Sequence, residues 1–141
     1  MKSKNLNNKF VLFTDGGSRG NPGPAATGVF LCTPDKSFVK EMGTYLGKAT
    51  NNEAEYAALV LGMKAALRAG AKQLVCYLDS ELIVKQLRGI YKMKNARLKV
   101  FFDEIKALEL ELERVAYKHV PREKNKKADA LVNEVLDNSK V

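Results

Sequence analysis

The sequence predicts an α/β domain built on a five-stranded mixed sheet, three antiparallel strands followed by parallel ones, with helices on both faces. Two observations lead to this fold class. Runs rich in β-branched and aromatic residues come first along the chain, and helical patterns then alternate with further strands. The chain has 141 residues, of which 45 % are hydrophobic, so one domain can bury a proper core.

Three strands open the predicted sheet as an antiparallel meander. The first covers residues 9–15, the run KFVLFTD, and a turn-rich loop over residues 16–24 follows it. The second strand covers residues 25–33, and a Pro-Asp turn leads to the third, residues 37–46. These connections are short enough for antiparallel pairing.

The pattern then changes to helices that alternate with strands. Thr50 and Glu53 form a capping box at the start of a helix over residues 50–69, which Gly70 ends. Residues 72–79 are an apolar strand directly after this helix. The connection is therefore a crossover, and the pairing is parallel.

The last third of the chain adds three helices and the fifth strand. Residues 80–88 predict a short helix, and residues 97–112 a longer one with a single apolar face. Residues 114–120 form the fifth strand, and Asn125 can cap the final helix. The inward face of that helix carries Leu131, Val132, Val135 and Leu136.

The ends of the chain are polar and flank the predicted domain. We expect the domain to span residues 9–137, with flexible tails at residues 1–8 and 138–141. The first nine residues lack the apolar region of a secretory signal, and no apolar run approaches the roughly 20 residues that span a membrane. We therefore expect a cytoplasmic protein without a membrane partner.

The two cysteines indicate the same compartment. Cys32 and Cys76 stand singly inside β-like apolar runs, without the spacing of metal ligands. We expect both thiols to be reduced and buried, and a disulfide is the alternative.

Positive charge is segregated along the chain. Lys and Arg number 24 against 16 Asp and Glu, a net charge of +8. Residues 85–99 hold six cations and no acid, with Tyr91 among them, and residues 118–127 hold five cations against Glu123 alone. This distribution favours a nucleic-acid partner over a merely solvated basic surface.

Four carboxylates stand where the stability of strands and helices does not require them. Asp15 and Asp79 end the first and fourth predicted strands, where a turn or helix-capping role is the alternative. Glu55 and Asp129 lie on inward-facing sides of their helices, where a carboxylate loses hydration at considerable cost unless a cation compensates. Glu53 is explained by the capping box, so we assign it no chemistry.

These four side chains can converge on one patch and bind divalent cations. Carboxylate oxygens without His or Cys select Mg²⁺ or Mn²⁺ rather than Zn²⁺. Two such ions about 3.5 to 4 Å apart can activate a water and stabilise the leaving oxygen of a phosphoryl displacement. An acidic metal site inside a basic protein therefore predicts phosphodiester chemistry.

Four motifs, in order and spacing, resemble those of the type 1 ribonuclease H family. Residues 13–23 (FTDGGSRGNPG) resemble its first motif, and residues 50–55 its T-N-N-x-x-E motif. Residues 78–80 resemble its D-S motif and residues 125–129 its N-x-x-A-D motif. The resemblance covers about residues 9–136 and implies the ribonuclease H-like fold.

In function, the resemblance implies an endoribonuclease that cuts the RNA strand of RNA–DNA hybrids and leaves 5′-phosphate and 3′-hydroxyl ends. Two Mg²⁺ ions, replaceable by Mn²⁺, would be its cofactor, with no small-molecule cofactor. By position, Asp15 would bridge the two ions and Asp129 would complete the site of the water-activating ion. Glu55 and Asp79 would hold the ion beside the leaving 3′ oxygen, with Glu55 also near the ribose 2′-hydroxyl.

The resemblance also assigns substrate contacts. The backbone at Gly16 and Gly17 can approach the RNA because neither residue has a Cβ. The family contacts RNA at the positions of Asn21, Asn51 and Asn52, and contact with 2′-hydroxyls distinguishes RNA from DNA. The remaining implied contacts are Ser18 in the first motif and Thr50 beside the DNA phosphate.

The sequence departs from the family pattern in two places. Many members have a basic protrusion where residues 89–96 are short, which suggests a compact form in which Lys92 and Lys94 partly substitute. Many members also have a mobile catalytic histidine. His119 has a fitting separation from Asp129 but falls within the predicted last strand, so a structural role and an auxiliary one stay open. Arg122 or Glu123 is the alternative for that auxiliary role.

Two other functions are alternatives for this sequence. A phosphate-cradling loop at residues 16–20 is excluded because no Gly-Lys-Ser/Thr follows and the next element is a strand. A non-catalytic module that binds hybrids is the more serious alternative. All four carboxylates are present, however, so we favour the enzyme, acting as a monomer.

Overall fold

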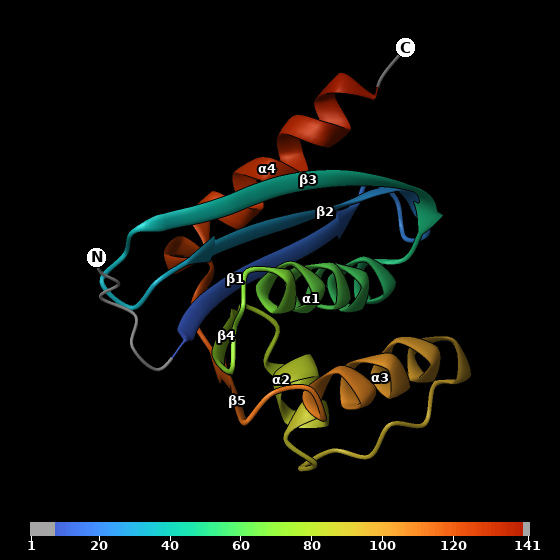
Figure 1. Ribbon diagram of the computed structural model, residues 1–141. Helices are drawn as coiled ribbons and strands as arrows, with labels where there is room; N and C mark the ends of the chain where they lie inside the picture. Colours follow the sequence, from blue (N-terminus) through green and yellow to red (C-terminus); the bar gives the residue numbers. More distant parts are fainter. Residues whose placement is uncertain (1–7, 140–141) are drawn as a thin grey trace.

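The computed structural model describes residues 8–139, which form an α/β arrangement around a central sheet (Figure 1). The five strands lie in the order β3-β2-β1-β4-β5. Their bounds are β1 (Lys9–Ser18), β2 (Gly23–Cys32), β3 (Phe38–Ala49), β4 (Gln73–Leu78) and β5 (Arg114–His119). The helices are α1 (Asn51–Arg68), α2 (Glu81–Leu87), α3 (Ala96–Glu109), the short 3₁₀ helix η1 (Arg122–Lys124) and α4 (Lys126–Asn138).

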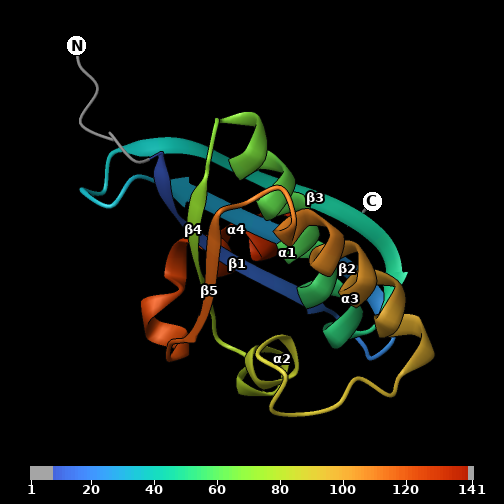
Figure 2. The ribbon, with the colours of Figure 1, turned by 60° about the horizontal axis from the view of Figure 1, so that its bottom comes forward.

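The predicted fold class is confirmed. β1, β2 and β3 pair antiparallel, β4 pairs parallel with β1, and β5 pairs parallel with β4. The two views show α1, α2 and α3 on one side of the sheet and α4 on the other (Figure 2). The carboxyl ends of β1 and β4 therefore lie between two helical layers.

The strands of the meander are longer than the sequence predicts. β1 continues through Gly16 and Gly17 to Ser18 because both glycines pair in register with β2. β3 likewise runs on to Ala49. The predicted loop over residues 16–24 was wrong in extent: glycine is depleted in strands, so a glycine pair indicates a turn, and only the pairing with β2 keeps it extended.

Helix α1 is formed as predicted. The Thr50 hydroxyl accepts from the Glu53 backbone N–H at 3.1 Å, and the Glu53 carboxylate accepts from the Thr50 N–H at 2.8 Å. Gly70, at φ 96°, follows the C-cap. At Gly62 the helix lies so close to β1 that an added Cβ would stand 2.9 Å from the methyls of Leu12.

Most of the core lies between the sheet and the layer of α1, α2 and α3. Its largest fully buried side chains are Leu12, Leu31, Tyr56, Leu59, Met63, Leu74, Ile83 and Ile105. A smaller cluster on the other face joins Ala26 to Val132 and Leu136, with Val135 packed against it. The predicted inward face of α4 is thus present, although Leu131 and Val135 are only half-buried.

The last two connections differ in detail from the prediction. Helix α3 ends at Glu109 rather than at residue 112. Asn125 stands at the N-cap position of α4, but its side chain makes no capping hydrogen bond. It turns instead to the sheet and donates to the Thr14 carbonyl at 2.9 Å. The predicted cap is therefore wrong.

At both ends of the described chain, regular backbone contacts include residues that the sequence analysis places in the tails. The Asn8 carbonyl accepts from the backbone of Lys72 and Gln73, and α4 reaches Asn138. Residues 1–7 and 140–141 lie outside the described residues. Cys32 and Cys76 are buried free thiols, as expected. Across residues 8–139, no helix combines the length and apolarity needed to cross a membrane.

Candidate active site

Three carboxylates from three elements meet at the carboxyl ends of β1 and β4. Asp15, Glu55 and Asp79 each offer an oxygen that lies within 4.8 Å of the others. The parallel register pairs Phe13 with Tyr77, so the aspartate two residues after each ring stands at the same edge of the sheet. The sheet pairing therefore brings Asp15 and Asp79 together.

Close helix packing supplies Glu55. An added Cβ at Gly16 would stand 2.2 Å from the backbone carbon of Ala54, so α1 lies directly on β1 at this point. Only glycine permits this approach. The first turns of α1 thus place the Glu55 carboxylate beside Asp15.

The fourth carboxylate arrives on α4. Asp15 pairs with Gly28 of β2, and an added Cβ at Gly28 would stand 2.1 Å from the Ala128 carbonyl oxygen. Asp129 follows Ala128, and its side chain shares a hydrogen bond with the Asp15 carboxyl. Asp129 lies outside the group of three within 4.8 Å, but it raises the pKa of Asp15, so it stands close enough to act on the same cluster.

Burial sets the protonation of this cluster. Asp15 is 7 % exposed, and burial raises its pKa to about 8, helped by repulsion from Asp79 and Glu55 and by the hydrogen bond with Asp129. Burial and the charge of Asp79 raise the pKa of Glu55 to about 7, against the lowering effects of the Ser80 hydroxyl and the Arg122 charge. At neutral pH the metal-free cluster therefore retains protons.

The donor set fits a divalent metal ion. Its oxygens are all carboxylate, which is the preference of hard cations, and a cation would relieve the repulsion that raises these pKa values. Asp15 lies within 4.8 Å of Glu55 and Asp79, and its pKa also responds to Asp129, so it is the carboxylate that all three others influence.

Two supporting residues were not assigned from the sequence. Asn125 is fully buried, and its amide donates to the Thr14 carbonyl at 2.9 Å and to the Asp79 carboxylate at 3.5 Å. Ser80 caps α2 through the Ile83 N–H and also hydrogen-bonds to Glu55. Both residues stand in motifs that are visible in the sequence. A motif alone does not show which carboxylate each of these side chains lies beside.

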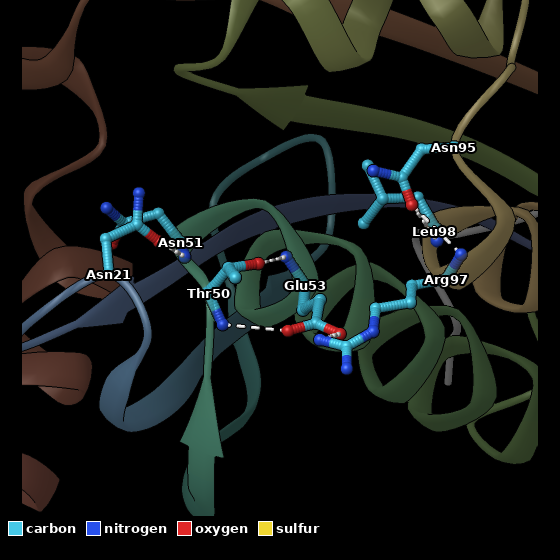
Figure 3. Close-up of polar contacts among 7 residues, drawn as sticks. All are labelled: Asn21, Thr50, Asn51, Glu53, Asn95, Arg97 and Leu98. Atoms are coloured by element: carbon cyan, nitrogen blue, oxygen red, sulfur yellow. Dashed lines mark hydrogen bonds and ion pairs between the residues drawn. The ribbon is translucent and has the colours of Figure 1, made fainter.

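Three of the predicted substrate residues, Asn21, Thr50 and Asn51, lie together at the start of α1 (Figure 3). The Asn51 side chain accepts from the Ser18 N–H at 2.8 Å, and the Asn21 side chain accepts from the Asn51 N–H at 3.0 Å. These bonds tie the β1–β2 loop to the helix. The rim formed by Ser18, Asn21, Thr50, Asn51 and Asn52 is therefore one connected structure beside Gly16 and Gly17.

The basic residues 85–99 also reach the start of α1. Asn95 caps α3 through the Arg97 and Leu98 N–H groups, and Arg97 reaches the Glu53 carboxylate at 3.8 Å (Figure 3). Lys92 and Lys94 are exposed in the short connection before α3 and form no ion pair with any residue in 8–139.

The three candidates for an auxiliary role, His119, Arg122 and Glu123, lie in two different elements. His119 is exposed and ends β5, paired with Leu78, so the expected strand location is confirmed. Arg122 and Glu123 are exposed in η1. The Arg122 charge acts on Glu55, which makes Arg122 the candidate with an electrostatic connection to the cluster.

Comparisons with known proteins agree with this geometry. The sequence model of a family described as Reverse transcriptase-like matches residues 13–135. A ribonuclease HI of Halobacterium salinarum is 41 % identical over 127 residues, which are 90 % of this chain and 64 % of that protein. A bifunctional protein of Mycobacterium tuberculosis is 42 % identical over 130 residues, 92 % of this chain. The chain spans only 36 % of the length of that mycobacterial relative.

Solved structures are similar over their full length. RNase H1 from Halobacterium salinarum superposes with a TM-score of 0.90 at 40 % identity, covering 93 % of this chain and 99 % of that one. LC11-RNase H1 in complex with an RNA/DNA hybrid superposes with a TM-score of 0.89 at 39 % identity, and the match covers 94 % of this chain and 99 % of that one. With the four motifs, the sheet order and these matches in agreement, the chain belongs to the type 1 ribonuclease H family, in a compact form with a short connection between α2 and α3.

Proposed function

We propose that the protein is an endoribonuclease that hydrolyses the RNA strand of RNA–DNA hybrids and leaves 5′-phosphate and 3′-hydroxyl ends. The observation that carries the proposal is the convergence of four carboxylates on one sheet edge of a protein with a net charge of +8. The relatives named ribonuclease H support it, as does the similar LC11-RNase H1, whose structure holds an RNA/DNA hybrid.

The proposed cofactor is Mg²⁺, two ions per site, for which Mn²⁺ can substitute. Asp15, Glu55, Asp79 and Asp129 would hold it, with Asp15 shared. Bound there, such ions activate a water and stabilise the leaving oxygen of a phosphodiester. The Asn125 amide donates to the Asp79 carboxylate at 3.5 Å, and the Ser80 hydroxyl lowers the pKa of Glu55, so these two residues support the carboxylates that would hold the ions.

Hybrid recognition is assigned to the rim beside the cluster. Carboxamides such as Asn21, Asn51 and Asn52 can hydrogen-bond to ribose 2′-hydroxyls, which DNA lacks. The backbone of Gly16, Gly17 and Ser18 and the Thr50 hydroxyl complete that rim. Lys92 and Lys94 supply charge for phosphates on the side of α3. Arg122 is proposed as an auxiliary phosphate contact, with His119 and Glu123 as further candidates.

We further propose that the enzyme acts as a monomer in the cytoplasm. The two buried free thiols support the cytoplasmic location, because thiols stay reduced in that compartment. A non-catalytic hybrid-binding module is the alternative. It would gain nothing from four carboxylates held together against their mutual repulsion.

The test is cleavage of an end-labelled RNA–DNA hybrid in Mg²⁺, in Mn²⁺ and in EDTA, beside single-stranded RNA, double-stranded RNA and double-stranded DNA. Metal-dependent cutting confined to the RNA strand of the hybrid is the expected result. Hybrid binding without cutting in either metal would favour the binding module. Asp103→Asn, an exposed carboxylate on α3 paired with Lys99, serves as the matched control and should cut normally.

A further inference from the structure

Within residues 8–139, the sheet face that carries α4 is only partly covered. Helix α4 packs over the carboxyl end of β1 and over β2 and β3, where Gly17, Gly28 and Gly43 admit it. Beyond its contacts the same face continues across the start of β1, the end of β2 and strand β4. The apolar side chains there are half-buried, and Phe38 is 59 % exposed.

Four aromatic rings form a row across this open region, one from each of four adjacent strands. We name Phe38, Phe30, Phe13 and Tyr77 the aromatic row. Its successive ring centroids lie 5.8, 6.5 and 5.1 Å apart, and Phe13 and Tyr77 are stacked with planes 18° apart. The strand pairings of Phe13 with Phe30 and with Tyr77 fix the row on one face.

The row is not required by the core. The core of β1 is formed by the alternate residues, such as the fully buried Leu12 on the opposite face. An uncovered face of a sheet normally carries polar side chains. A contiguous apolar patch there is typical of a binding surface.

Cations border the row. The Lys127 ammonium lies 4.8 Å from the centroid of the Phe30 ring. Arg114 and Lys118 share the open face of β5, because Tyr117 between them is buried on the core side. Neither forms an ion pair with the described part of the chain. Glu41, paired with Phe30 across β2 and β3, is an acid beside the row, and Asp15 lies further along the same face.

The row also adjoins the carboxylate cluster. Phe13 precedes Asp15 by two residues on β1 and points to the same face, while Tyr77 precedes Asp79 by two residues at the end of β4. One end of the row therefore meets the site to which the cleavage is assigned.

We propose that the aromatic row binds single-stranded nucleic acid, with bases against the rings and phosphates near Lys127, Lys118 and Arg114. Aromatic side chains bordered by cations suit this ligand, because every base has a π-face and every nucleotide carries a charge. The same border disfavours a second copy of this basic chain. The inference rests on the proposed function, since the strand would be the one that extends beyond a hybrid at the active site.

A tryptophan reporter tests the row directly. The chain contains no tryptophan, so Phe38→Trp places a single reporter on the row and Leu110→Trp places one on an 88 % exposed site after α3. Each variant is titrated with oligodeoxythymidylate in EDTA, which prevents cleavage. We expect strong quenching of the Phe38→Trp emission and none for Leu110→Trp. Oligonucleotide binding, followed by anisotropy, without quenching at residue 38 would overturn the proposal.

A second variant removes the rings but keeps apolar side chains. Phe30→Leu with Phe38→Leu should weaken single-strand binding about tenfold or more, and leave the affinity for a blunt hybrid unchanged. Equal single-strand affinity in the variant would contradict the proposal, and so would a Phe38→Trp emission that changes only with protein concentration, as in self-association. Hybrid cleavage without quenching overturns the row alone, whereas quenching without cleavage overturns the proposed function alone.

Discussion

Asp15 is buried at a point where its neighbours are also acidic. The carboxylates of Glu55, Asp79 and Asp129 all act on its pKa, and both burial and repulsion favour the protonated form. A divalent cation reverses this preference by supplying the missing positive charge. Proton and metal therefore compete for the same oxygens.

This competition predicts a pH-dependent stability of the metal-free protein. The pKa values of Asp15 and Glu55 rise to about 8 and about 7 in the folded state, so the folded chain holds protons that the unfolded chain has released. The contribution of these two groups to the free energy of unfolding is greatest below their pKa values in the unfolded chain. It is lost as pH rises through their pKa values in the folded state. We expect the Tm in EDTA to fall by several degrees between about pH 5 and about pH 8.

Two comparisons check that assignment. Asp15→Asn should flatten this decline, because the amide does not titrate, and Mg²⁺ should raise the wild-type Tm more at the upper end of the pH range than at the lower. A decline of equal slope in the variant, measured by thermal denaturation, would show that other groups cause it.

Asp79→Asn should abolish cleavage and leave the fold intact. The amide keeps the size of the side chain but removes a metal-binding charge, and even outer-shell changes at metal sites cost about 10 to 100-fold. We expect a loss of more than about a hundredfold in turnover, with hybrid binding in EDTA largely preserved. Circular dichroism decides between the two roles of Asp79: loss of the folded signal would mean that this residue is structural.

His119→Ala should reduce turnover less than about tenfold, because the ring ends β5 and its replacement leaves the carboxylates in place. Single-turnover cleavage and product release are measured separately. A larger loss confined to product release would instead assign His119 an auxiliary role.

At the scale of elements, glycines decide how closely each helix approaches the sheet. Gly16 admits α1 and Gly28 admits α4, and each contact places a carboxylate beside Asp15. The site therefore depends on three packed layers rather than on one loop.

Gly28→Ala should separate α4 from the sheet. The added methyl would stand 2.1 Å from the Ala128 carbonyl oxygen. Because this oxygen belongs to the backbone, the overlap can be relieved only if the helix moves. We expect a loss of about 1 to 3 kcal/mol in unfolding free energy and a smaller Mg²⁺-dependent Tm shift, because Asp129 moves with the helix. Gly17→Ala is the matched control: its methyl would meet a side-chain methyl of Val132 at 3.3 Å, a much smaller overlap, and should cost less in urea denaturation.

The sequence predicts these elements well where periodicity or capping specifies them. The capping box of Thr50 and Glu53 and the apolar face of α4 appear as expected. Pairing across the sheet is not a local property, so the extension of β1 through Gly16 and Gly17 could not be anticipated. The role of Asn125 was missed for the same reason, because its partner Thr14 lies 111 residues away in the chain.

At the scale of the whole molecule, acidic and basic regions are separated. In the carboxylate cluster, Asp15 is buried and the other carboxylates are half-buried, while Lys92 and Lys94 are exposed beside the start of α3. Such an arrangement attracts a polyanion over a distance without neutralising the metal ligands.

Lys92→Gln with Lys94→Gln should therefore weaken hybrid binding most at low salt. Each lost phosphate contact lowers the slope of log affinity against log salt by about 0.7 to 0.9, so the double variant should lose about 1 to 2. Anisotropy titrations in EDTA at several salt concentrations measure this slope. An unchanged slope would place the phosphate contacts elsewhere, and Lys40→Gln, exposed on β3, is the control.

The hydrogen bonds that join Ser18, Asn51 and Asn21 have a thermodynamic consequence. These bonds hold the β1–β2 loop against the start of α1. The loop therefore loses its conformational entropy when the chain folds and not when a ligand binds. The proposed recognition of a hybrid at this rim would therefore start from a rigid template. Selectivity for ribose would then come from unmatched hydrogen bonds alone, without an ordering transition that any nucleic acid could induce.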